Sequence, residues 1–311
     1  MRRPTLPLSL LLLTVATALV AAQGPGPAGG RGPGGRGPAV TTVDLGGGLT
    51  LISAGSNSVL AAGRDEAILV DTTFGGPAFV AKVADVTRVP VRTVINTHSH
   101  PDHTGANADF GRQGALIVST ANAATRMAMD FPSPRGGFDP AVPPEGRPRE
   151  TFTDRKTVSI DGQRAELVAL PPSHTDGDAY VYFPAANVLV MGDLHHSNEY
   201  PVYDADSGCR CGSFDGNLRA YDAMLTAGNE RTTYIPGHGG PTTKAEVTAY
   251  VAMLRRVRDQ VTALIAQGRT ADEVVAAKPI ADDRSPTSPG TDNRDQFVST
   301  LYNALKTGQG R

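Results

Sequence analysis

The alternation of apolar and polar positions predicts short strands at the start of the folded part of the chain. Apolar, β-branched runs separated by glycine, asparagine or aspartate cover residues 49–52, 58–61, 67–70 and 91–95. Between the last two runs, Phe79, Val80 and Val83 recur with helical spacing, which predicts a helix over 77–86. The same patterns then predict a helix after Gly105, a strand over 115–118 and a second helix over 120–129.

A second series of strands and helices follows. Strands are expected over 158–160, 165–169, 179–183 and 188–191, and helices over 218–226, 244–267, 271–277 and 295–305. Between the two series, residues 131–149 are rich in proline, glycine and arginine, so we expect a surface loop near the functional site. The repeated order of strands and then helices predicts two similar αβ halves, with their sheets packed face to face between outer helices.

The N-terminus has the pattern of an export signal. Two arginines precede an apolar run over residues 8–22, and small residues precede Gln23. A transmembrane helix is the alternative, but it needs about 20 apolar residues, and Pro4 and Pro7 shorten the run. We therefore expect 1–22 to be a cleaved signal peptide, which makes the protein exported, periplasmic or secreted, with no stable membrane insertion after cleavage.

Residues 23–38 are expected to form a disordered linker. Glycine and proline make up 12 of these 16 residues, so the segment cannot bury enough apolar surface to offset the entropy of ordering it. A single folded domain is therefore expected over 39–311. Cys209 and Cys211 lie within it as a C-x-C pair, which could form a local disulfide in an exported protein or remain two thiols.

Composition excludes some classes of partner. The 311 residues include 29 lysines and arginines against 31 aspartates and glutamates, for a net charge of −2. This balance provides no electrostatic attraction to nucleic acid, so none is expected as a partner. Tryptophan is absent and only 5% of residues are aromatic, which argues against binding by stacking on bases or sugars. A small-molecule substrate is the expected partner.

Histidine and aspartate gather at the ends of predicted strands. The segment Thr-His-Ser-His-Pro-Asp-His over 97–103 follows the run at 91–95, and three further residues follow other apolar runs: His174, Asp193 and His238. The carboxyl ends of strands are where α/β proteins build their sites. Imidazole and carboxylate ligands without a thiolate suit zinc best, with iron or manganese possible.

The order and spacing of these residues resemble the metallo-β-lactamase-fold hydrolase superfamily, over nearly all of the chain from Val40. The resemblance implies one α/β domain, a four-layer αβ/βα sandwich with metals at one edge of the central sheets. It also implies two sets of ligands. The first metal would be held by His98, His100 and His174, the second by Asp102, His103 and His238, and Asp193 would bridge both.

The implied chemistry is hydrolysis. Two Zn²⁺ ions about 3.5–4 Å apart generate a metal-bound hydroxide near neutral pH, which can open a carbonyl–heteroatom bond. Asp102 would be catalytic, because it can bind metal and also accept a hydrogen bond that orients the hydroxide. We therefore expect an exported binuclear zinc hydrolase of β-lactams or other amides, lactones or thioesters. Dedicated zinc β-lactamases usually have Cys or Ser at the position of Asp193, which makes that specialised role less probable.

Three polar residues beyond Asp193 are candidates for substrate binding. His195, His196 and Asn198 are expected on a loop that faces the site, where they could contact substrate or stabilise an oxyanion. They could equally support the ligands or be surface residues. Some superfamily β-lactamases place a lysine at the position of His196 to hold the substrate carboxylate. Asp71, at the end of the 67–70 run, is expected to bond to the metal loop rather than to a metal.

Two other functions remain open. The superfamily includes mononuclear-iron sulfur (persulfide) dioxygenases, which would use His98, His174 and Asp193. A metal-binding module without catalytic activity would bind metal without turnover.

Overall fold

The computed structural model describes residues 39–132, 138–197, 199–203, 211–280 and 293–308. The expected signal peptide and linker, together with Asn198 and Cys209, lie outside these residues. Within them, no helix combines the length and the apolar character that crossing a bilayer requires.

The first sheet begins as an antiparallel meander and becomes parallel after its fourth strand. Its spatial order is β1-β2-β3-β4-β5-β6-β9, and β4, β5, β6 and β9 pair in parallel. All four residues of β4 are buried, as expected for a strand covered on both faces. The bounds are Thr41–Gly46, Leu49–Ser53, Asn57–Ala62, Ala67–Val70, Val91–Ile95, Leu116–Thr120 and Glu150–Phe152.

The second sheet has the order β10-β11-β12-β13-β14-β15, with a parallel pairing only between β13 and β14. Its strands span Arg155–Ile160, Gln163–Ala169, Ala179–Phe183, Val188–His196, Thr233–His238 and Thr242–Thr243. A separate two-stranded hairpin, β7 (Phe131–Pro132) and β8 (Phe138–Asp139), lies within the predicted 131–149 loop, followed by the 3-10 turn η1 (Pro144–Gly146).

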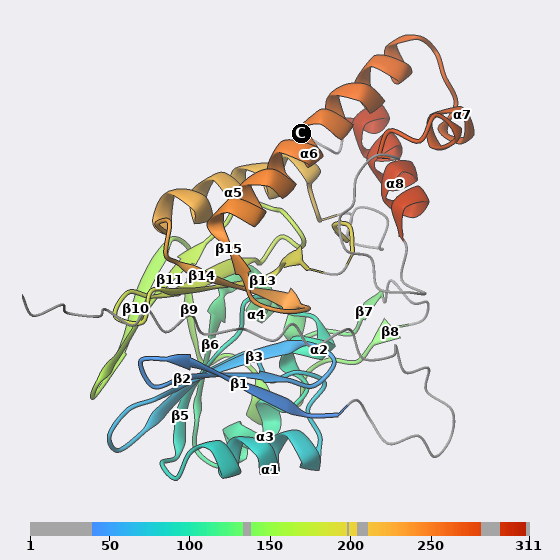
Figure 1. The fold of residues 1–311 in the computed structure, drawn as a ribbon. Coiled ribbons are helices and arrows are strands. Elements are labelled where there is room, and N and C mark those ends of the chain that lie inside the picture. The colour runs from blue at the N-terminus through green and yellow to red at the C-terminus, as the bar shows by residue number, and fades with distance from the viewer. Residues whose placement is uncertain (1–38, 133–137, 198, 204–210, 281–292, 309–311) are drawn as a thin grey trace, which may run out of the picture.

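Three apolar cores hold four layers together. The two sheets pack face to face through residues such as Val70, Leu167 and Val181. Figure 1 shows α1 and α3 covering the outer face of the first sheet, and α5 and α6 covering the second. The helices are α1 (Pro77–Val86), α2 (Pro101–Thr104), α3 (Asn107–Arg112), α4 (Ala121–Met127), α5 (Phe214–Ala227), α6 (Lys244–Ala266), α7 (Ala271–Ala276) and α8 (Arg294–Thr307). The predicted four-layer αβ/βα sandwich is confirmed.

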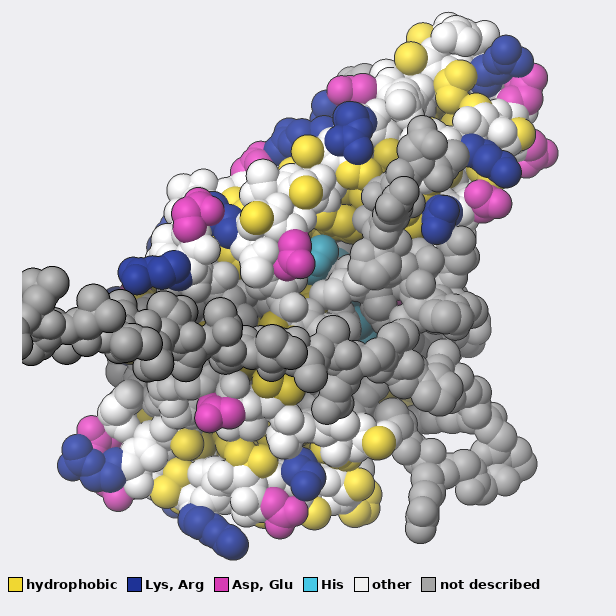
Figure 2. Space-filling view, viewed as in Figure 1, with side chains coloured by type: hydrophobic (Ala, Val, Ile, Leu, Met, Phe, Trp, Pro, Cys, Tyr) yellow, Lys and Arg dark blue, Asp and Glu magenta, His cyan; other side chains and the backbone are white. Residues whose placement is uncertain are grey.

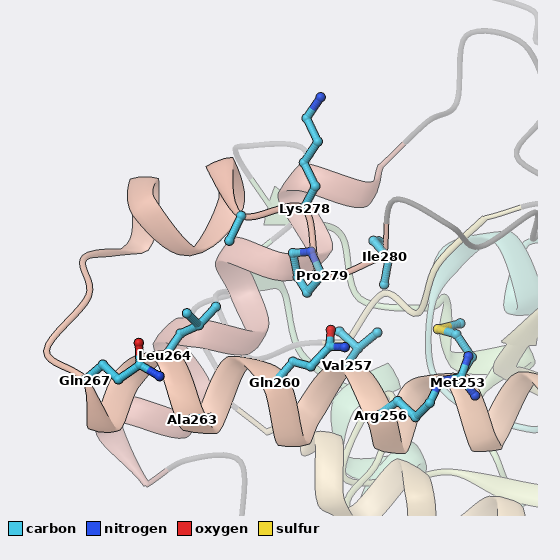
Figure 3. Close-up of a pocket in the computed structure, with 11 residues that line it drawn as sticks. Met253, Arg256, Val257, Gln260, Ala263, Leu264, Gln267, Lys278, Pro279 and Ile280 are labelled. Carbon is cyan, nitrogen blue, oxygen red and sulfur yellow. The ribbon is translucent and has the colours of Figure 1, made fainter.

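The long helix α6 extends beyond the sheet it covers and carries α7 and α8 on its far part (Figure 1). It begins with a capping box in which Thr243 and Glu246 satisfy each other's backbone N–H groups. Figure 3 shows a cavity of about 540 Å³ here, with Leu264 of α6 on one side and Pro279 and Ile280 on the other. Lys278 points away from α6 (Figure 3). The C-terminal helices therefore form an additional packing unit on α6.

The predicted elements differ from the observed ones mainly around the loops. The helix α2 and the strands β1, β9 and β15 were not predicted, because they are short or, in β1, mostly exposed. The run at 188–191 continues as β13 to His196, so the predicted strand end before Asp193 is wrong. The apolar-run criterion ended the strand where polar residues begin, although those polar residues are buried.

Removing a large side chain from the core between the sheets should destabilise the protein strongly. Phe183 on β12 is 1% exposed, so Phe183→Ala should lower the free energy of unfolding by about 3–5 kcal/mol. Val43→Ala on β1, where the side chain is 48% exposed, should change it by less than about 0.5 kcal/mol. Urea unfolding of both variants in excess chelator makes the comparison. Equal midpoints would contradict the inter-sheet core.

Candidate metal centre

Four strands and the loops that follow them bring the predicted ligands together at one edge of the two sheets. The segment after β5 supplies His98 to His103, the β11–β12 loop supplies His174, β13 supplies Asp193 and β14 ends at His238. The ligand atoms form two groups, each within 4.8 Å: His98, His100, His174 and Asp193; and Asp102, His103, Asp193 and His238. All seven predicted ligands are therefore neighbours, and Asp193 belongs to both groups.

The carboxylate of Asp193 lies between the two groups. Its Oδ2 atom is 3.7 Å from Nε2 of His98, 3.6 Å from Nε2 of His174 and 3.5 Å from Nε2 of His238. Its Oδ1 atom is 3.0 Å from Nε2 of His103. One carboxylate thus faces both groups, as a bridging ligand must. Bridging itself stays a prediction.

The chemistry of these atoms fits a divalent cation. Nε2 of His98, Nε2 of His103 and Oδ1 of Asp193 are buried, and among the described residues they have no partner in hydrogen-bonding geometry. Buried polar atoms without partners are costly, so they call for a ligand. Zinc ligands lie about 2.0–2.2 Å from the ion, so donors that share one ion are separated by no more than about 4.4 Å. The ligand atoms of each group lie within 4.8 Å of one another, slightly wider than this limit.

The electrostatics differ among these residues. Burial alone would lower the pKa of His103, but Asp193, Asp102 and Asp71 outweigh it and hold that pKa well above its ordinary value, so this ring must release a proton to bind a metal. Burial, with His103 adding to it, holds the pKa of His98 well below its ordinary value, so the ring is neutral and can ligate. Burial alone would raise the pKa of Asp193, but His103, His238 and His196 outweigh it and hold that pKa well below its ordinary value. Asp193 is therefore ionised.

Hydrogen bonds from outside the two groups fix the rings. Asp71, at φ 59° after β4, accepts bonds from the Thr97 backbone N–H at 2.8 Å and the Thr97 hydroxyl at 2.7 Å. Its Oδ2 also lies 2.9 Å from Nδ1 of His103, which leaves Nε2 of that ring facing Asp193. His238 is held in the same way, with Nδ1 2.9 Å from the carbonyl oxygen of Gly55. Asp71 bonds the metal loop, as expected from the sequence.

A bulge in β13 brings two of its side chains to the cluster. Gly192 pairs with Pro236 and His196 pairs with His238, so β13 advances four residues while β14 advances two. Close packing at the bulge requires glycine on both strands. A Cβ on Gly192 would lie 2.6 Å from the hydroxyl oxygen of Thr97, and a Cβ on Gly237 would lie 1.8 Å from Oδ1 of Asp193.

The candidates His195 and His196 lie on β13, so their predicted position on a loop is wrong. His195 faces the helical layer: Nδ1 is 3.0 Å from the Tyr221 hydroxyl, and its ring lies 4.9 Å from that of Tyr250. Burial lowers the pKa of His195 to about 3. His196 faces the cluster, with Nε2 3.5 Å from Oδ2 of Asp193. Of the two, only His196 faces Asp193, although both line a cavity beneath α6.

Glu199 is a site residue that the sequence analysis missed. Its Oε1 atom lies 2.8 Å from Nδ1 of His196, and this contact orients the His196 ring toward Asp193. The only sequence signal for this contact was that Glu199 follows His196 by three residues. Figure 2 shows small areas of histidine below α6, largely hidden by other atoms, in keeping with the burial of His195 and His196.

Comparison with known proteins decides the family. The family model of the metallo-beta-lactamase superfamily matches residues 53–260. The chain belongs to the metallo-beta-lactamase superfamily. The prediction of a metal-dependent hydrolase of this superfamily is thereby confirmed at the level of class, and the site is a candidate divalent-metal centre.

Two curated relatives cover parts of the chain. The 2,4-dinitroanisole O-demethylase subunit alpha of Nocardioides sp. (strain JS1661) is 31% identical over 209 residues, 65% of this chain and 58% of that subunit. The metallo-beta-lactamase type 2 of Bacteroides fragilis is 29% identical over 187 residues, 59% of this chain and 69% of that enzyme. The chain thus spans little more than half of the O-demethylase subunit.

Solved structures share the fold. A metallo-beta-lactamase from Pontibacter korlensis has a TM-score of 0.56 at 19% identity, covering 70% of this chain and 99% of that one. The inverting sec-alkylsulfatase Pisa1 from Pseudomonas sp. has a TM-score of 0.62 at 18% identity, covering 85% of this chain and 50% of that one. Similarity at these identities supports the superfamily fold and carries no assignment of substrate.

Helix α8, which lies beyond the part matched by the superfamily model, reaches the metal centre through Tyr200. Asn293 at its start accepts a hydrogen bond from the Tyr200 N–H at 2.9 Å and donates one to the Tyr200 carbonyl at 3.0 Å. The Tyr200 ring stacks on Phe297 at 5.7 Å. Two residues on, the Val202 carbonyl oxygen lies 2.5 Å from Nδ1 of His174. The C-terminal helix therefore helps to orient a metal-group histidine.

Loss of the Asp71 carboxylate should weaken metal binding. Asp71→Ala removes three hydrogen bonds from Thr97 and His103, so we expect metal affinity to fall about 10–100-fold, as for other residues that support ligands. Titration against a chromophoric chelator measures it. Asp161→Ala, which removes an exposed contact with Arg64, is the control and should keep wild-type affinity. Equal affinities in the two variants would contradict the role of Asp71.

Loss of the Asn293 side chain should also weaken metal binding, through its contacts with Tyr200. Asn293→Ala removes both bonds to the Tyr200 backbone, and through Val202 it should lower metal affinity by about 10-fold. Asn303→Ala, at an exposed position of α8, is the control for general effects on the helix. If chelator titration gives both variants the same metal affinity as the unchanged protein, the coupling of α8 to His174 is wrong.

Proposed function

We propose that this protein is an exported binuclear zinc hydrolase that opens a carbonyl–heteroatom bond in a small molecule. The single observation that carries the proposal is the buried Asp193 carboxylate between two complete groups of histidine and aspartate side chains. One tetrahedral zinc site needs four ligands, and the seven residues here supply four to each of two sites by sharing Asp193.

Each residue has a separate task in this proposal. His98, His100 and His174 would hold the first ion, and Asp102, His103 and His238 the second. Bound zinc would polarise the substrate carbonyl and lower the pKa of water. The Asp102 carboxylate, 3.1 Å from Nε2 of His238, is placed to accept a hydrogen bond from the attacking water and so to orient it. His196, held by Glu199, would contact the substrate opposite Asp193.

Amides, lactones and thioesters are the proposed substrate class, and an aryl methyl ether belongs in the same screen. The curated relative named as a 2,4-dinitroanisole O-demethylase subunit is the reason for including the ether. Because the chain matches only part of that subunit, O-demethylation is included as a candidate reaction and is not the reaction that we expect.

Metal content and two substitutions test the proposal. Protein dialysed after zinc loading should hold about two ions per chain, measured by elemental analysis. Asp193→Ala should lose metal and turnover together, by at least the roughly 10–100-fold expected for residues that merely support ligands. His196→Ala should keep both ions and lower kcat/KM to a degree that differs among substrates. One bound iron, with oxidation of a sulfur substrate in place of hydrolysis, would favour the dioxygenase alternative. Two bound ions without turnover of any substrate would favour a metal-binding module.

The proposed export has its own test. The basic, apolar and small-residue order of residues 1–22 supports removal of this segment. Mass spectrometry of protein from the exported fraction should then find an N-terminus at or near Gln23. A full-length cytoplasmic species as the sole product would contradict export.

A further inference from the structure

A second feature beside the metal groups is a cavity of about 340 Å³ between α2, α4 and the β7–β8 hairpin. His100 forms part of its wall, and Nδ1 of His100 lies 2.9 Å from Nε2 of His174. His100 is therefore shared between the cavity and the first metal group. A molecule that reacts at that group can place a substituent in the cavity without leaving the site.

The wall of this cavity is largely apolar. Among the side chains that line it are Pro101, Ala108, Met127, Met129 and Phe131. Met127 is buried, whereas Met129 is 46% exposed, and Phe138 on the neighbouring strand β8 is 71% exposed. Exposed large apolar side chains beside a polar site are typical of ligand binding, and unbranched methionine adapts to the shape of its ligand.

The charges in the wall leave no cation for an anionic ligand. Arg126 forms a two-bond pair with Asp176 at 2.6 and 3.3 Å and lies over the Phe131 ring at 5.0 Å. Arg112 pairs with Asp109 at 2.6 Å. An anionic substituent would have to compete with these carboxylates. An uncharged substituent has no such competitor, and it gains from burial against the apolar wall.

We propose that this cavity binds an uncharged aryl or alkyl group of the substrate, so that the preferred substrates carry an apolar acyl group rather than a carboxylate. The proposal rests on the proposed hydrolase function, whose reacting centre is the adjoining metal groups. A volume of about 340 Å³ is at the lower end of the roughly 300–1,000 Å³ usual for ligand pockets, so it fits one ring or a medium alkyl chain.

The test compares three thioesters on the zinc-loaded full chain: acetyl, phenylacetyl and para-carboxyphenylacetyl. Burying the ring should raise kcat/KM for the phenylacetyl over the acetyl substrate by about 10–100-fold, the equivalent of the roughly 1.5–3 kcal/mol expected for a buried apolar side chain. The added carboxylate should abolish this gain. A higher kcat/KM for the carboxylated substrate would overturn the proposal.

Matched substitutions locate the effect. Met129→Glu places a charge in the wall and should reduce the phenylacetyl-to-acetyl ratio of kcat/KM at least fivefold. Val43→Glu is the control, because Val43 is exposed to nearly the same fraction, 48%, and lies on β1 outside the cavity wall. An unchanged ratio in Met129→Glu, or an equal fall in both variants, would overturn the proposal.

A binding measurement separates this proposal from the hydrolase function. The chain has six methionines, so methyl-labelled methionine gives a resolvable NMR spectrum. Titration with phenylacetamide should shift the methyl signals of Met127 and Met129 and leave that of Met224, a buried residue of α5, in place. Such shifts without turnover of any substrate would support the cavity and contradict the hydrolase. Turnover that is equal for the acetyl and phenylacetyl substrates, without these shifts, would support the hydrolase and overturn the cavity.

Discussion

The buried carboxylate of Asp193 is the constraint on which the site depends. A buried charge is tolerated in a protein only when opposite charges or ions compensate for it. Here five imidazole rings place Nε2 atoms within 3.7 Å of its two oxygens: His98, His103, His174, His196 and His238. These rings come from both sheets, so the charge can be compensated only when the two halves of the sandwich are packed in register.

The fold meets this constraint with an irregular strand. A regular β13 would alternate its side chains between the two faces of the sheet. The bulge opposite Pro236 and His238 instead lets Asp193 and His196 face the cluster while His195, between them, faces Tyr221. A strand bent in this way packs closely against its neighbours, which explains the need for glycine at 192 and 237. Asn57 of the first sheet connects the two sheets at this edge, because its side chain donates hydrogen bonds to the carbonyl oxygens of Pro236 and Gly239.

The sequence predicted the parts of the molecule that depend on local pattern. The buried runs that became β2 to β5, the spacing of His98 to His103 and the long apolar face of α6 are all local signals, and the structure contains each of these elements. The orientation of His195 and His196 depends on the pairing of β13 with β14, whose partners are about 40 residues apart. The contacts of Asn293 with Tyr200 depend on tertiary packing across 93 residues. Neither leaves a periodic signal in the sequence, so neither could be predicted from it.

Two cavities border the cluster, one with His100 in its wall and the other with His196. On the side of His100, the wall is apolar and its arginines are paired. On the side of His196, a cavity of about 700 Å³ has charged side chains in its wall, among them Glu199, Glu246 and Arg256. The two cavities therefore differ in volume and in the charged groups of their walls. Under the proposed function, this difference in size and charge would let the site distinguish the two ends of a substrate held at the metal groups.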